Sequence, residues 1–392
     1  MQLSDRVQRI KPSPTLAVTF RAAELRAGGK DIIGLGAGEP DFDTPQHIKD
    51  AAIKAINDGF TKYTAVDGTP GLKQAVIGKL QRDNGLSYTP AQILVSCGGK
   101  QSFFNLAQAL LNPGDEVIIP APYWVSYPDM VLLADGVPVI LETGMAEGFK
   151  LTPTQLDAAI TPRTRLVVIN SPSNPTGVTY TRRELADLGA VLRRHPHVLI
   201  ATDDMYEKIL WADEPFCNIL MVCPDLYPRT IVLNGVSKAY AMTGWRIGYA
   251  AGPQPLIQAM TNVQSQSTSN PTSISQVAAQ AALNGDQSCI QTMLKAFKQR
   301  HDFVVAGLNE ITGVRCLPSQ GAFYSFPSFH EVLATRPELK DDVALADFLL
   351  NTAEVALVPG SAFGAPGFMR LSFATSLEQL REALRRLKRA LG

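Results

Sequence analysis

Lys238 has the sequence surroundings of a nucleophile. It follows an apolar run at residues 231–233, which predicts a buried strand, and a turn that begins at Gly235. A lysine at the end of a buried strand is poorly solvated, and desolvation lowers the pKa of its ammonium group towards the neutral amine. Neutral amines condense with aldehydes to form Schiff bases. These residues therefore predict covalent chemistry on a carbonyl compound.

An arginine follows at a short distance along the chain. Arg246 stands between Gly244 and Gly248 and opens a second apolar run at residues 247–251. An arginine in a glycine-bordered pocket suits a phosphate dianion. An aldehyde and a phosphate together describe pyridoxal 5'-phosphate, so this segment predicts a site for that cofactor.

The composition limits the alternatives. A chain of 392 residues exceeds one ordinary core and favours two domains, and 45% hydrophobic with 18% charged residues fits a globular enzyme. Thirty-six basic residues balance thirty-six acidic ones, which argues against a nucleic-acid or membrane-surface partner. The sequence contains no membrane-length apolar run and no signal-peptide pattern at residues 1–6, so we expect a cytoplasmic protein. The five cysteines lack Cys-x-x-Cys spacing and the histidines lack a metal pattern, so we expect free thiols and no metal site.

Short apolar runs alternate with amphipathic segments through most of the chain. We expect strands at residues 93–96, 116–120, 137–141, 166–170, 198–202, 230–233 and 247–251. Helices are expected between them, for example at 101–111 and 182–193, and one long helix at 273–309. This alternation predicts an α/β fold with a mostly parallel sheet covered on both faces, followed by a small α+β region.

Open parallel sheets bind ligands at the carboxyl ends of their strands. The polar, aromatic or glycine residues that follow the expected strands are Gly98, Gly99, Lys100, Trp124, Asn174, Asp203, Tyr206, Ser237 and Lys238. Taken singly, each has a plain structural alternative, such as a glycine turn, core packing of a tryptophan or a helix N-cap. Because all of these residues are expected at the same edge of the sheet, a binding site explains them better than separate structural roles do.

The pattern Gly235-Val236-Ser237-Lys238, continuing through Ala241-Met242 to Gly244 and Arg246-Ile247-Gly248, resembles the lysine signature of class I aminotransferases. The resemblance covers essentially the whole chain and is strongest to bacterial aspartate aminotransferases, through Lys11-Pro12-Ser13-Pro14-Thr15 and Gly36-Ala37-Gly38-Glu39-Pro40-Asp41-Phe42. It implies a fold-type I transferase dependent on pyridoxal phosphate. The implied large domain spans 45–280 around a mostly parallel seven-stranded sheet. Residues 1–44 and 281–392 would form a discontinuous smaller α+β domain.

The resemblance also implies roles for individual residues. Lys238 would hold the cofactor as a Schiff base and shuttle a proton, and Asp203 would pair with the protonated ring nitrogen. Tyr206 and Asn174 would bond the ring hydroxyl oxygen, and Trp124 would stack on the ring. The remaining expected cofactor contacts, mostly to the phosphate, are Gly98, Gly99, Lys100, Ser237, Arg246 and, across a homodimer with shared active sites, Tyr63.

Substrate recognition follows from the same resemblance. Arg370 would grip the α-carboxylate of an amino acid bidentately, with Gly38, Trp124 and Asn174 nearby. Lys100 would recognise the distal carboxylate of aspartate or glutamate. Lys11 matches a position associated with accepting prephenate. The implied reaction is ping-pong transfer of an amino group from an L-amino acid to a 2-oxo acid such as 2-oxoglutarate or oxaloacetate.

Other functions remain open at this point. A β-C–S lyase on the same fold needs the same lysine and aspartate, and an aminotransferase could prefer prephenate or aromatic substrates. A nicotinamide oxidoreductase fits poorly, since the third glycine of Gly-x-Gly-x-x-Gly falls on Glu39. A DNA-binding regulator would need an additional module and a basic surface.

Overall fold

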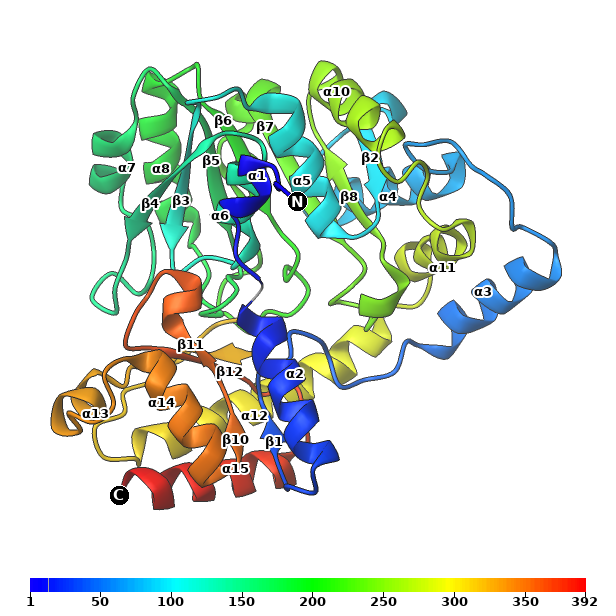
Figure 1. The fold of residues 1–392 in the computed structure, drawn as a ribbon. Coiled ribbons are helices and arrows are strands. Elements are labelled where there is room, and N and C mark those ends of the chain that lie inside the picture. The colour runs from blue at the N-terminus through cyan, green and yellow to red at the C-terminus, as the bar shows by residue number, and fades with distance from the viewer. Residues whose placement is uncertain (13) are drawn as a thin grey trace.

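The computed structural model describes residues 1–12 and 14–392, arranged as a large α/β region and a smaller region beneath it (Figure 1). Ser13, part of the Lys-Pro-Ser segment quoted above, lies outside the described residues. Within the described part of the chain, no helix combines the length and apolarity needed to cross a membrane.

A mixed seven-stranded sheet forms the centre of the large region, in the order β2-β8-β7-β6-β5-β3-β4. Its strands are β2 (Ile93–Ser96), β3 (Glu116–Ala121), β4 (Val137–Glu142), β5 (Thr164–Asn170), β6 (Leu199–Asp203), β7 (Thr230–Gly235) and β8 (Gly248–Ala251). Strand β8 runs antiparallel to β2 and β7, and every other neighbouring pair is parallel. The predicted mostly parallel sheet is confirmed, with strand ends displaced by at most two residues.

Alternate residues of each strand enter two separate cores. Val117 and Ile119 of β3 pack in one core and Ile118 in the other, as the two-residue period of a strand requires. Helices α5 (Gly99–Leu110), α6 (Ser126–Leu133) and α10 (Gln254–Ser265) contribute to the first core. The second receives α3 (Gln46–Asn57), α4 (Pro70–Asn84), α7 (Pro153–Ala159), α8 (Arg182–Arg194), α9 (Ile219–Val222) and α11 (Ser273–Asn284). Because both faces are covered, the strands read as continuous apolar runs.

The smaller region combines the two ends of the chain. Its strands are β1 (Ile33–Gly34), β9 (Tyr324–Ser325), β10 (Val355–Ala356), β11 (Val358–Pro359) and β12 (Met369–Ser372). Its helices are α2 (Pro14–Ala27), α12 (Ser288–Asn309), α13 (His330–Thr335), α14 (Asp342–Phe348) and α15 (Leu377–Leu391), and a short α1 (Asp5–Gln8) precedes them. Strand β1 pairs in parallel with β10, so α2 lies beside the C-terminal strands (Figure 1). The division into domains at residues 44 and 280 stays a prediction.

The long helix expected at 273–309 is interrupted, and that prediction was wrong. Gly285 ends α11 in an extended conformation, where a Cβ would lie 2.6 Å from the Ala281 carbonyl oxygen. Asp286 then accepts the Ser288 N–H at 3.0 Å at the start of α12. The apolar pattern continues through both helices, which explains why periodicity alone missed the break.

Candidate active site

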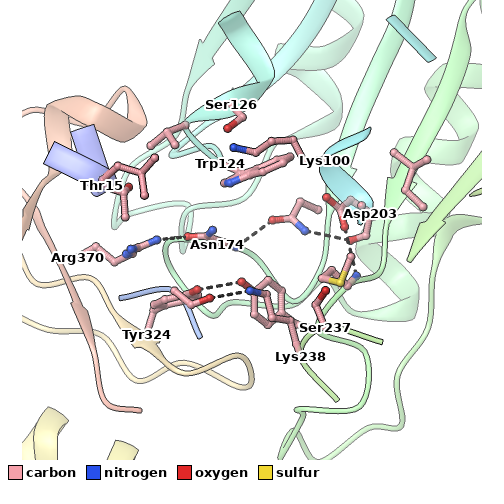
Figure 2. A pocket seen from close by; sticks show the side chains of 18 of the residues that line it. Thr15, Lys100, Trp124, Ser126, Asn174, Asp203, Ser237, Lys238, Tyr324 and Arg370 are labelled. Carbon is pink, nitrogen blue, oxygen red and sulfur yellow. Dashed lines mark hydrogen bonds between the residues drawn. The ribbon is translucent and has the colours of Figure 1, made fainter. Parts of the chain in front are cut away.

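A cavity of about 370 Å³ lies between the carboxyl ends of the central strands and the smaller region (Figure 2). The structure brings most of the predicted site residues to its wall: Gly38, Gly99, Lys100, Trp124, Asn174, Asp203, Tyr206, Ser237, Lys238, Arg246 and Arg370. Asp203 ends β6 and Lys238 follows β7 of the central sheet, whereas Arg370 comes from β12. A single cavity therefore depends on both regions.

Lys238 lies in the turn that follows β7. Its Nζ donates a hydrogen bond of 2.6 Å to the carbonyl oxygen of Gly38. The pKa of Lys238 falls to about 8, first because the ammonium group is buried and second because of the charges of Arg370 and Arg246. With that pKa, Lys238 is neutral in about a tenth of the molecules at pH 7, whereas an ordinary lysine is neutral in far less than a hundredth. The neutral amine required for attack on a carbonyl is thus available near neutrality.

Asp203 is the last residue of β6, next to β7 in the sheet. Its Oδ2 accepts a hydrogen bond from the Tyr127 hydroxyl, and its Oδ1 accepts the Met205 N–H at 3.2 Å. Burial raises the pKa of Asp203, and these two hydrogen bonds act in the opposite direction by stabilising the carboxylate. A buried carboxylate held in this way suits a cationic partner such as a protonated ring nitrogen.

Arg370 is 2% exposed and lies between two aromatic rings, with its guanidinium carbon 4.5 Å from the Tyr324 ring centre and 5.0 Å from that of Phe363. One terminal nitrogen donates to Asn174 Oδ1 at 2.9 Å (Figure 2), and the other donates to the Gly36 carbonyl at 2.7 Å. Its Nε has no partner among the described residues. Since a guanidinium carries five N–H groups, each terminal nitrogen keeps one for a ligand. The arrangement suits a bidentate carboxylate.

Two phenols meet in the cavity wall. The hydroxyl groups of Tyr206 and Tyr324 lie 2.9 Å apart, and both rings are buried. Burial raises the pKa of both phenols, so both remain protonated near neutral pH. Tyr206 can therefore offer a hydrogen bond to an oxyanion in the cavity.

An anion cradle forms where the start of α5 meets Arg246. Gly98 precedes α5 with φ 89°, a conformation that favours glycine, and a Cβ there would overlap the Arg246 guanidinium. The Arg246 nitrogens donate to the Thr243 carbonyl at 3.0 Å and the Cys97 carbonyl at 3.2 Å, which fixes the side chain beside the helix start. The first N–H groups of α5 and the helix dipole complete an anion site. With Lys238 and Asp203, the cradle fits pyridoxal phosphate.

Lys100 and Trp124 lie together on the cavity wall. The Lys100 Nζ lies 5.4 Å from the Trp124 ring centre, and desolvation, with a smaller contribution from Arg246, lowers the Lys100 pKa. Trp124 meets the Tyr127 ring edge-on at 5.1 Å, which fixes the indole plane. The Trp124 ring and the Lys100 ammonium group therefore both border the cavity (Figure 2).

Two predicted residues lie away from this cavity. Tyr63 is 92% exposed, in keeping with a role that requires a neighbouring subunit. Lys11 lines an adjacent groove near Asp129 instead of the cavity. Their proposed contacts to cofactor and substrate stay predictions.

Other lining residues were missed from the sequence: Thr15, Ser126, Asn170 and Tyr324. Asn170 ends β5, so the strand-end argument could have found it; its Oδ1 accepts the Asn174 N–H at 2.9 Å. Tyr127, which bonds Asp203, follows Trp124 by three positions at helical spacing, a weak signal. Tyr324 has no sequence signal, because only the fold of the smaller region brings it to Tyr206.

The lowered pKa of Lys238 predicts the pH dependence of cofactor capture. The rate at which cofactor-free protein reacts covalently with pyridoxal phosphate should rise about tenfold per unit up to about pH 7 and level off above about pH 8, since the neutral amine is the reacting form. Stopped-flow absorbance measures this rate. Binding of pyridoxamine phosphate, which lacks the aldehyde, is the control and should not share that profile. A rate still climbing tenfold per unit at about pH 9 would show an ordinary lysine.

The hydrogen bond from Tyr127 predicts the effect of Tyr127→Phe. Without this donor the Asp203 carboxylate is less stable, so its pKa rises and its hold on a protonated ring nitrogen weakens. We expect turnover to fall by about 10- to 100-fold, the range for a hydrogen bond to a charged group, and cofactor to dissociate more readily. Steady-state kinetics and equilibrium dialysis measure both. Tyr123→Phe, which removes a nearby hydroxyl not bonded to Asp203, is the matched control; equal behaviour of the two variants would contradict the assignment.

Comparisons with known proteins agree with this geometry. The profile of the family "Aminotransferase class I and II" matches residues 30–387. An aspartate/prephenate aminotransferase of Nitrosomonas europaea is 63% identical over the full length of both chains, and an aspartate aminotransferase of Geobacillus stearothermophilus is 54% identical over 99% of this chain and 98% of that one.

Solved structures give the same result. The aspartate aminotransferase of Rhizobium meliloti superposes with a TM-score of 0.95 at 50% identity, covering 100% of this chain and 99% of that chain. The aspartate aminotransferase of Thermus thermophilus with maleate gives a TM-score of 0.93 at 46% identity over the whole of both chains. Class I aminotransferases use pyridoxal phosphate, the cofactor that the cavity fits. From its fold, its cavity and these relatives, the chain belongs to the class I and II aminotransferases.

Proposed function

We propose that the protein is an aminotransferase dependent on pyridoxal phosphate, with aspartate or glutamate as amino donor and oxaloacetate or 2-oxoglutarate as oxo acid. The observation that carries the proposal is the meeting of Lys238, Asp203 and Arg370 in one cavity. An amine with a lowered pKa, a buried carboxylate and a preset guanidinium correspond to a reactive nucleophile, a partner for a ring cation and a clamp for an α-carboxylate.

When bound, the cofactor supplies an electron sink that acidifies the Cα–H bond of the amino acid. The proposed contacts to it are the α5 start and Arg246 for the phosphate, Asp203 for the ring nitrogen and Tyr206 with Asn174 for the ring hydroxyl. Trp124 would cover one face of the ring, and Lys238 would be the covalent attachment point.

The remaining steps fall to side chains of this chain. Arg370 orients the substrate through its α-carboxylate, which places Cα beside Lys238. A free Lys238 amine beside the substrate would accept the proton released from Cα and would later give it up again. Its pKa of about 8 suits both directions of that transfer near neutrality. Proximity to Arg370 favours the neutral form, which is the form that accepts a proton.

Charges in the cavity support a dicarboxylic substrate. Among its described lining residues, the cations are Lys100, Lys238, Arg246 and Arg370, against one carboxylate, Asp203. Once Arg246 meets the phosphate and Arg370 the α-carboxylate, Lys100 is left for a second carboxylate. The Thr15 Oγ1, buried and without a partner among the described residues, is a further donor at the same cavity. The names of the relatives and the maleate, a dicarboxylate, in the Thermus structure agree with this proposal.

Prephenate is the second substrate that we propose, because the relatives from Nitrosomonas europaea and Cereibacter sphaeroides are named aspartate/prephenate aminotransferases. Lys11 belongs to this part of the proposal, although its side chain lines the neighbouring groove. The β-C–S lyase alternative is not favoured by these relatives.

We further propose a homodimer in which Tyr63 reaches the partner's cofactor phosphate. The exposed side chain of Tyr63 supports this, as do the exposed Ile53, Ile56 and Phe60 in and after α3. An apolar group of this kind on one stretch of surface is typical of an interface between subunits. A cytoplasmic location stays a prediction.

Half-reaction spectra test the function most simply. Aspartate or glutamate added to the holoenzyme should convert its near-visible absorption to that of the amino form of the cofactor, and 2-oxoglutarate should reverse the change. Alanine should react far more slowly. Lys238→Ala should lose both the original band and turnover. Spectra unchanged by every amino acid, or pyruvate and ammonia released from β-substituted donors without an oxo acid, would refute the proposal.

Replacing Lys100 tests the dicarboxylate assignment. Lys100→Met should lower kcat/KM for aspartate by about 10- to 100-fold relative to alanine, the range for losing a charged hydrogen-bond partner. Arg370→Met is the contrasting variant and should reduce kcat/KM for both donors, because each carries an α-carboxylate. An unchanged aspartate-to-alanine ratio in Lys100→Met would remove Lys100 from distal recognition.

A further inference from the structure

A buried polar network lies outside the cavity wall. Its members are Lys79 and Asn84 of α4, Glu207 in the turn after β6, and Asn234 of β7, each 7% exposed or less. None of the four lines the cavity, and none has a part in the reaction proposed above. Burying charged groups costs free energy because they lose their hydration, so a structural or functional role is expected for this network.

Glu207 is the centre of this network. Its Oε1 accepts the Asn234 Nδ2 at 3.0 Å and its Oε2 accepts the Asn84 Nδ2 at 3.0 Å. Lys79 forms an ion pair with the same carboxylate and donates to Asn84 Oδ1 at 2.8 Å. Both oxygens of the carboxylate are therefore bonded, and three separate elements of the fold meet on one side chain.

Two of those elements carry reactive groups. Glu207 follows Tyr206 directly in the chain, and its N–H donates to the Asp204 carbonyl at 2.9 Å, which closes the turn. Asn234 lies on the strand that leads to Lys238, and its Oδ1 accepts the Gly235 N–H at 2.7 Å, which fixes the strand end. The Glu207–Asn234 hydrogen bond thus connects the turn that carries Tyr206 to the segment that carries Lys238.

The backbone does not provide this connection by itself. In the described structure, the register of β6 with β7 ends at Asp203 and Leu233, and the Asp204 N–H to Leu233 carbonyl bond of 2.9 Å follows it. Strand β6 ends at Asp203, whereas β7 continues beyond Leu233 as the partner of β8, so the described residues show no further β6–β7 ladder pairing there. The Glu207–Asn234 hydrogen bond continues the connection through side chains.

Stability alone is a weak reason for this arrangement. A buried ion pair can often be replaced by apolar residues of similar volume without loss of stability, although removing one partner is harmful. The surroundings add further charge. Asp83 lies 4.0 Å from Lys79 and bonds Lys208 at 2.8 Å, while buried Asp204 bonds Thr202 and Asn218. Geometric specificity accounts for the network better than net stabilisation does.

We propose that Glu207 is a positioning residue for the amino-transfer reaction. Through its hydrogen bond to Asn234, it fixes the position of the Tyr206 hydroxyl relative to the Lys238 amine. The inference rests on the proposed function, because it concerns groups assigned to that reaction. Glu207 touches neither substrate nor cofactor. Its loss should therefore lower kcat while leaving the KM for the amino donor, which Arg370 governs, nearly unchanged.

Two matched double variants of the holoenzyme isolate hydrogen bonding from charge. In Lys79→Met with Glu207→Gln, the new amide accepts from Asn234 and donates to Asn84, whose amide is free to turn once Lys79 is gone. In Lys79→Met with Glu207→Met, both contacts are lost while side-chain volume is kept. We expect the first variant to keep most of the wild-type kcat and the second to lose between about 10- and 100-fold, as small misplacements of reacting groups do.

The pH titration of the bound cofactor's absorption is the second readout. In the Glu207→Met double variant its midpoint should rise by about half a unit or more, since a displaced Tyr206 hydroxyl stabilises the ring oxyanion less well. Loss of stability alone would leave both kcat and that midpoint unchanged in the folded fraction. Wild-type kcat and midpoint in this variant would overturn the inference.

If the Glu207→Met double variant does not fold, Asn234→Ala answers the same question with the Lys79–Glu207 pair intact. It should show the same loss of kcat and the same rise in midpoint, and wild-type values would overturn the inference. The wild-type protein separates this outcome from the proposed function. If wild-type protein fails to exchange amino groups, the function is wrong; if it does so and the variants match it, only the role of Glu207 is wrong.

Discussion

The site depends on positive charge confined in a poorly solvated cavity. Burial disfavours the charged forms of Arg370 and Lys238, but the consequence differs with the residue type. Arg370 has so high an intrinsic pKa that it remains charged despite burial. Lys238 is the group that loses its charge more readily, because burial and the neighbouring guanidinium groups together lower its pKa to about 8. The same confinement thus leaves Arg370 charged and Lys238 partly neutral near pH 7.

Both of these cations are held by one short stretch of the N-terminal segment. The Gly36 carbonyl accepts from Arg370 and the Gly38 carbonyl from Lys238. That stretch follows β1, whose pairing with β10 fixes it against the smaller region. The pairing of β1 with β10, together with the Ser372 N–H to Leu35 carbonyl bond, therefore helps to place this stretch between Arg370 of β12 and Lys238 after β7. The glycines allow the backbone to approach both side chains, and the Tyr324 hydroxyl lies only 3.1 Å from where a Cβ of Gly38 would be.

Much of the site could be predicted from the sequence because the carboxyl ends of parallel strands lie at the same edge of a sheet. Asp203, Asn174 and Lys238 each follow an apolar run in the sequence, and all three line the cavity. Tyr324 and Tyr127 could not be found in this way. Tyr324 meets Tyr206 only through packing of the two regions, and Tyr127 sits on a helix face indistinguishable from ordinary core. Local pattern also failed at Gly285, where one residue breaks a helical repeat that continues on both sides.

The central claim is that burial in a cavity shared with Arg370 and Arg246 makes Lys238 the residue that would hold the cofactor. Borohydride reduction of the holoenzyme followed by peptide mass spectrometry tests it directly. We predict a phosphopyridoxyl adduct on the peptide that contains Lys238, and on Lys238 itself when that peptide is fragmented. An adduct on Lys100 or another lysine, or no adduct in protein that carries the cofactor, would contradict the account.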